Sequence, residues 1–162
     1  MAEAEKKPAN NPSLQKKTGA RMAAVQCLYT AGFGEEKNTP AQAVARLKKQ
    51  LEGNREEQKL QTGMALEPNY KLLERLLEGV HANIDEIDKR MDSVLSAEWK
   101  RERMSPLLIA ILQCAIYEMF FDKEIHPKIV IDEYTRMTRS FFAEPEVNFV
   151  HGALSKLAEI YA

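Results

Sequence analysis

The cations near the N-terminus are the residues best suited to bind a nucleic acid. Residues 1–21 carry five basic and two acidic side chains, whereas the whole chain of 162 residues has a net charge of −1. A nucleic acid would therefore need a local patch, and its candidates are Lys16, Lys17 and Arg21. Such cations contact phosphates and release counterions, so the affinity falls with salt. Taken alone, these charges favour an ordinary solvated, lysine-rich terminus.

Aromatic side chains are the second group that could contact RNA. The rings of Tyr29 and Phe149 could stack on unpaired bases, which is how proteins commonly recognise single-stranded RNA. Gln26 lies three residues before Tyr29 and could hydrogen-bond a base or bridge two helices. Tyr29 suits a position in or beside the core equally well. For Gln26 and Tyr29, the side-chain types leave both RNA contact and helix packing open.

Motifs of catalysis and of metal binding are missing from the sequence. It contains no G-x-x-x-x-G-K-[ST], no G-x-G-x-x-G, no H-E-x-x-H and no C-x-x-C. Asp85, Asp88 and Asp92 share one face of a predicted helix. Lys89 and Arg90 lie among them, which indicates a solvated surface with local ion pairs. We expect a protein that is not an enzyme and needs no metal or cofactor.

Apolar residues recur three and four positions apart along the chain, which predicts an all-α fold. The expected helices cover about residues 14–31, 40–51, 70–95, 106–121, 129–141 and 146–160. Ser105 and Pro106 are a typical N-cap and first-position proline. The helix that follows is apolar almost all round, so Leu112 and Ile116 should lie at the centre of the core.

The chain length fits one domain, which we place at residues 13–162. Residues 1–12 are polar and predict a disordered tail, and the charged segment at about 52–66 predicts a mobile loop. No apolar run approaches the roughly 20 residues of a membrane span. Cys27 and Cys114 occur in apolar helical patterns, as free thiols do in a reducing compartment. We therefore expect a cytoplasmic protein.

Five segments resemble motifs of the bacterial NusB family of transcription antitermination factors, in the same order. They are Arg21–Tyr29 (RMAAVQCLY), Ile84–Asp88 (IDEID) followed by Trp99, Leu112–Glu118 (LQCAIYE), Pro127–Glu133 (PKIVIDE) and Phe149–Leu154 (FVHGAL). Each motif alone is weak, but five in sequence are specific. The resemblance extends over about residues 15–160.

The resemblance implies a fold of two packed helical bundles and a role in transcription. NusB-like proteins bind the boxA element of nascent single-stranded RNA together with NusE, a small-subunit ribosomal protein. Such a factor would support ribosomal RNA transcription and meet other Nus factors and RNA polymerase indirectly. The RNA-binding residues would be Lys16, Lys17, Arg21, Gln26, Tyr29 and Phe149. The surface around Tyr117 and Glu118 would receive a protein partner, either NusE or a second copy in a homodimer.

The chain departs from the family pattern at several positions. The basic run at the first helix is thinner, Gln113 stands where an arginine is usual, and His151 replaces an asparagine. These departures leave open a second reading: a protein-binding module, either monomeric or homodimeric, with weak or altered RNA binding. A third reading is a detached accessory domain of the kind fused to RNA methyltransferases, but the chain has no methyltransferase motif.

Overall fold

The structure, a computed structural model, describes residues 12–31, 39–49, 68–122 and 124–161. Its helices are α1 (Pro12–Ala31), α3 (Tyr70–Ala82), α4 (Ile84–Asp92), α5 (Pro106–Tyr117), α6 (Pro127–Phe141) and α7 (Glu144–Ile160), with a further helix at residues 40–49. One turn of 3-10 helix (Arg101–Arg103) precedes α5, and one turn of π-helix (Glu118–Asp122) follows it. Within these ranges there is no strand. The predicted all-α fold is confirmed.

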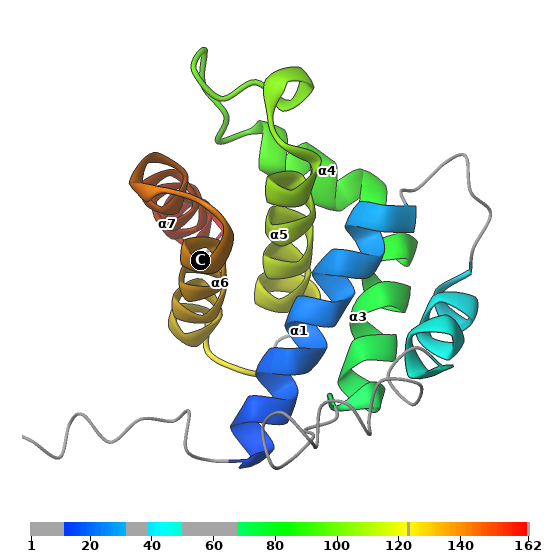
Figure 1. Cartoon of the computed structure of the whole chain (residues 1–162). Coiled ribbons are helices and arrows are strands. Elements are labelled where there is room, and N and C mark those ends of the chain that lie inside the picture. The colour runs from blue at the N-terminus through cyan, green and yellow to red at the C-terminus, as the bar shows by residue number, and fades with distance from the viewer. Residues whose placement is uncertain (1–11, 32–38, 50–67, 123, 162) are drawn as a thin grey trace, which may run out of the picture.

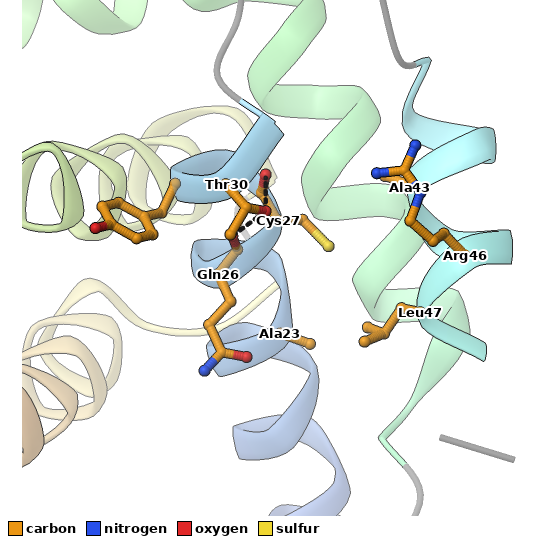
Figure 2. A pocket seen from close by; sticks show the side chains of 8 residues that line it. Ala23, Gln26, Cys27, Thr30, Ala43, Arg46 and Leu47 are labelled. Carbon is orange, nitrogen blue, oxygen red and sulfur yellow. Dashed lines mark hydrogen bonds between the residues drawn. The ribbon is translucent and has the colours of Figure 1, made fainter. Parts of the chain in front are cut away.

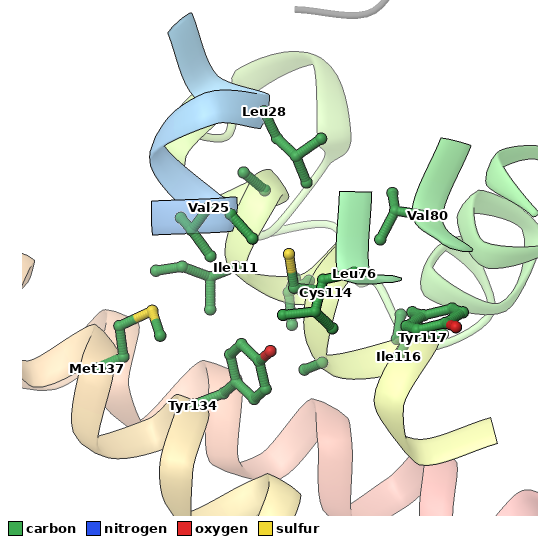
Figure 3. Packing of buried hydrophobic residues seen from close by; sticks show 14 of the residues in the cluster. Val25, Leu28, Leu76, Val80, Ile111, Cys114, Ile116, Tyr117, Tyr134 and Met137 are labelled. Carbon is green, nitrogen blue, oxygen red and sulfur yellow. The ribbon is translucent and has the colours of Figure 1, made fainter. Parts of the chain in front are cut away.

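Helix α5 is the centre of the fold. It lies between α1 and α3 on one side and α6 and α7 on the other, while α4 packs against it as well (Figure 1). Leu112 and Ile116 are fully buried, as the sequence predicts. Ser105 caps the helix by accepting a hydrogen bond from the Leu107 N–H at 3.2 Å, and Pro106 occupies its first turn. The two helical bundles therefore share one apolar core around α5 (Figure 3).

The helix predicted over residues 70–95 is two helices. Asn83 separates α3 from α4, with backbone angles φ −116° and ψ 21°. Its side chain donates to the Gly79 carbonyl at 2.8 Å, and its own carbonyl accepts from the Ile87 N–H at 2.9 Å. Asn83 thus ends one helix and begins the next. The apolar spacing continues across the break because both helices bury a face against α5.

Helices α1, α6 and α7 each begin two residues before the predicted start, and α6 begins at Pro127 behind the N-cap His126. Helix α7 begins at Glu144 rather than near Glu146, because Pro145 occupies its first turn, where a proline needs no hydrogen-bond acceptor. Helix α1 begins at Pro12, so this residue is not part of a disordered tail. The rest of the predicted tail and the predicted loop at 52–66 lie outside the described residues. No described helix is both long and apolar enough to cross a membrane.

Candidate nucleic-acid interface

Helix α1 carries the predicted RNA-binding side chains at both of its ends. Lys16 is exposed and Lys17 half-buried in the first turns, while Gln26 and Tyr29 are exposed near the C-terminal end. The two pairs are separated by about 14 Å along the helix axis, at 1.5 Å per residue. Each pair is accessible, but they do not form one compact cluster. An extended ligand could contact both.

Gln26 and Tyr29 belong to a groove between α1 and the helix at residues 40–49. The groove has a volume of about 470 Å³. In Figure 2, Ala23 and Cys27 face Leu47 across it, whereas the Gln26 side chain extends away from the second helix. The lining also includes the Arg46 guanidinium, so the groove combines apolar walls with a cation and could contact a base and its phosphate.

Arg21 is buried, with only 5% of its surface exposed. Its Nε donates to Glu118 Oε2 at 2.6 Å and its Nη2 to Oε1 at 3.1 Å. The Tyr134 hydroxyl donates to the same Oε2 at 2.6 Å, and Glu133 Oε1 lies 3.8 Å from Arg21 Nη1. The exposed position predicted for Arg21 is therefore wrong, because the guanidinium compensates a carboxylate inside the protein. Helix α1 is left with Lys16 and Lys17 as accessible cations at its start.

The surface predicted around Tyr117 and Glu118 is also wrong, because both residues are buried, at 8% and 2% exposed. The Tyr117 ring lies against α3 at Gly79, where an added Cβ would be 2.1 Å from the Tyr117 Cζ. The ring also lies parallel to Phe121, with centroids 6.2 Å apart. Glu118 is held by Arg21. These side chains join helices, so a protein partner would have to dock elsewhere.

Burial changes the proton affinities of Arg21 and Tyr134, which bind Glu118, and of the two cysteines. Desolvation, and then the negative charge of Glu118, raise the pKa of the Tyr134 hydroxyl and of the Cys114 thiol well above their ordinary values. Burial also raises the pKa of Cys27. For Arg21, burial lowers the pKa, but the hydrogen bond and charge of Glu118 outweigh it, so the net shift is upward. Both cysteines are free thiols.

We expect the free energy of unfolding to fall as the pH rises above about 9. In the unfolded chain, thiols and phenols lose their protons near pH 8.5 and 10, whereas folded Cys114 and Tyr134 keep theirs. The folded state then binds more protons, so stability falls by up to about 1.4 kcal/mol per pH unit for each group. Urea denaturation at pH 8, 9, 10 and 10.5 under reducing conditions measures this. Cys114→Ala should decline less steeply, and a flat profile for the parent would contradict the expectation.

Phe149 is placed by α7 and is half-buried, because its ring stacks on Trp99. The two centroids are 4.3 Å apart and the ring planes differ by 14°. Trp99 comes from the segment between α4 and α5 and is itself half-buried. A base could stack only on a face that this pair leaves free. Its neighbour Val150 is fully buried and faces the core.

Two aspartates of the α4 stripe share one arginine. Arg101 lies 2.9 Å from Asp88 Oδ2 and 3.0 Å from Asp92 Oδ2, and Gln113 donates to Asp88 Oδ1 at 3.1 Å. The surface does carry ion pairs, but not the predicted ones, because Arg90 pairs with Glu86 at 3.1 Å and the cation of Asp88 and Asp92 comes from beyond the helix. Among the described residues, no group of three or more His, Cys, Asp or Glu side chains could hold a metal ion.

The sequence model of the NusB family matches residues 18–159, which is most of the chain. The chain belongs to the NusB family. Curated relatives support this membership. The transcription antitermination protein NusB of Maricaulis maris is 30% identical over 161 residues, which cover 98% of this chain and 95% of that protein. The one from Caulobacter vibrioides is 30% identical over 148 residues, covering 90% and 93%.

Solved NusB structures have the same fold. A chain from the crystal structure of antitermination factors NusB and NusE in complex with double-stranded RNA superposes with a TM-score of 0.67. It is 21% identical, and the match covers 91% of this chain and 99% of that one. A NusB structure from T. maritima gives a TM-score of 0.61 at 23% identity, over 88% and 90%. The fold of two packed helical bundles is thereby confirmed.

Two features of this NusB-family chain were missed in the sequence. One is Trp99 as the stacking partner of Phe149, since the two are 50 residues apart. The other is a set of cations on α3, where Lys71 and Arg75 lie beside Lys17. Spacing on a predicted helix could have shown that Lys71 and Arg75 share a face. It could not have shown that this face meets the start of α1.

Proposed function

We propose that this protein is an RNA-binding transcription antitermination factor. It binds boxA-type single-stranded RNA of nascent transcripts together with NusE and supports ribosomal RNA transcription. The observation that carries the proposal is membership of the NusB family over nearly the whole chain. Relatives named as antitermination proteins support it, as does a chain of the same fold crystallised with NusE and double-stranded RNA.

The accessible side chains of the chain fit this function. Lys16 and Lys17 supply phosphate contacts at one end of α1, and Gln26 and Tyr29 supply hydrogen bonding and stacking at the other. Phe149 supplies a second aromatic ring on α7, which stacks on Trp99. The spacing of these groups requires an extended strand of RNA rather than a single nucleotide. The action is binding and not catalysis.

We place this activity in the cytoplasm, where bacterial transcripts are made. The alternative, a homodimeric protein-binding module with weak RNA affinity, is less favoured. The relatives compared are named antitermination proteins and match this chain over more than 90% of their own length, and Lys16 and Lys17 are accessible on α1. Loss of RNA binding in a well-folded sample would restore that alternative.

Replacing Lys16 and Lys17 together by Ala should weaken RNA binding and flatten its salt dependence. Each lost phosphate contact on a single strand reduces the slope of log affinity against log salt by about 0.7, so two contacts remove about 1.4. Fluorescence anisotropy with a labelled boxA-type RNA at several salt concentrations measures the slope.

The matched control is Lys89→Ala with Lys156→Ala, which removes two exposed lysines from α4 and α7. This control loses the same net charge away from α1, so its slope should change much less. If the Lys16 and Lys17 variant binds as the parent does at every salt concentration, the N-terminal lysines only keep the protein soluble.

A further inference from the structure

The first turns of α1 and the start of α3 form the walls of a small basic cleft. The Asn69 N–H, at the N-cap of α3, donates to the Lys16 carbonyl at 3.0 Å and fixes the two elements together. The cleft beside this bond has a volume of about 240 Å³. Its charged lining comprises Lys17, Arg21, Lys71, Arg75, Glu118 and Glu124.

Four cations and two carboxylates line the cleft, and two more carboxylates contact its arginines: Asp122 lies 3.1 Å from Arg75 and Glu133 lies 3.8 Å from Arg21. Two of the cations are already paired. Arg21 binds Glu118, and Arg75 donates to Asp122 at 3.1 Å and to Glu124 at 3.2 Å. These contacts neutralise the floor and one wall of the cleft.

The two remaining cations of the lining are Lys17 and Lys71. Neither forms an ion pair with another residue in the described part of the chain, and Lys71 is exposed. Two ammonium groups beside one polar cleft are chemically suited to a phosphate, because each is a compact charge with three rotatable N–H donors. The polar walls are poorly suited to an apolar ligand.

We propose that Lys71 binds a backbone phosphate of the RNA together with Lys17, so that the interface extends from α1 onto α3. The proposal rests on the proposed RNA-binding function and adds a residue to it. It also accounts for the thin basic run of α1: with Arg21 turned into the core, a cation from α3 takes its place at the surface. The ligand recognised is the sugar–phosphate backbone, so Lys71 adds affinity and not sequence preference.

The test compares Lys71→Ala, Lys71→Arg and the control Lys156→Ala by anisotropy with a labelled boxA-type RNA across salt concentrations. Lys156 is also an exposed lysine, on α7 across α5 from α3 (Figure 1). Lys71→Ala should flatten the log–log salt slope by about 0.7. A scrambled RNA should lose affinity by the same factor. Lys71→Arg should keep the parental slope, and the urea midpoint of each variant should match the parent.

The outcomes separate the two proposals. If Lys71→Ala matches Lys156→Ala while the Lys16 and Lys17 variant is weakened, RNA binding stands and the extension onto α3 is wrong. If all of these variants bind as the parent does, the proposed RNA-binding site on α1 fails as well. A loss confined to the boxA sequence would also overturn the proposal, because a backbone contact cannot discriminate bases.

Discussion

Replacing Arg21 by Ala should lower the free energy of unfolding by about 3–5 kcal/mol, the usual cost of breaking a buried ion pair by removing one partner. The substitution leaves the Glu118 carboxylate almost fully buried, with the Tyr134 hydroxyl as its remaining donor among the bonds described. Urea denaturation followed by circular dichroism measures the change. A loss below about 1 kcal/mol, as for an exposed pair, would show that Arg21 is not structurally buried in solution.

A triple variant separates the burial of the charge from the loss of packing. Arg21→Met, Glu118→Leu and Tyr134→Phe together replace the three buried polar side chains by apolar ones of similar size, while Glu133 keeps its contacts with Thr18 and Arg136. Replacing a buried ion pair by apolar residues is often neutral or stabilising, so this variant should recover most of the stability that Arg21→Ala loses. If it remains as unstable as Arg21→Ala, the cost comes from the packing of α1.

Arg21 also gives a direct test of its role in RNA binding. Because its guanidinium faces Glu118, Arg21→Ala should keep the parental salt slope in conditions where it is folded. The double variant with Lys16 and Lys17 replaced by Ala should instead have a flatter salt slope than the parent. A flattened slope for Arg21→Ala would mean that the arginine leaves the core when RNA binds.

The helices were predictable from the sequence because their apolar spacing is local information. The central position of α5 follows from a segment that is apolar on every side, and its start follows from Ser105 and Pro106. The break at Asn83 was not predictable from spacing. Spacing records which side of a helix is apolar but not whether the axis changes direction, and α3 and α4 both face α5.

The candidate site was predictable only in part, because the exposure of its side chains depends on contacts between residues far apart in the sequence. Arg21 follows two lysines at the start of a helix, so its sequence neighbours indicate a surface cation. Its partner Glu118 lies 97 residues away and becomes its neighbour only when α1 packs on α5. Tyr117 is buried for a similar reason, since its position depends on Gly79 in another helix. Charge and aromaticity identified the side chains, and tertiary packing decided which remain accessible.

NusE should strengthen RNA binding by this protein by about 5–150-fold, which corresponds to a coupling free energy of about 1–3 kcal/mol. By thermodynamic linkage, RNA must strengthen NusE binding by the same factor. The structure gives a reason to expect a strong dependence on the partner. With Arg21 buried, the described start of α1 offers Lys16 and Lys17, joined by Lys71 from α3 as proposed above, so this part of the interface makes few phosphate contacts.

Phe149→Ala should distinguish RNA contact from partner contact in the same system. It removes the ring stacked on Trp99, so RNA binding should weaken by about 1–3 kcal/mol if a base stacks on this pair. NusE affinity measured without RNA should be unchanged. Calorimetry on the protein with RNA, with NusE and with both gives all the required constants. Equal RNA affinity with and without NusE, combined with no detectable binding of NusE, would favour the homodimeric protein-binding module, because the coupling that defines an antitermination factor of this type would then be missing.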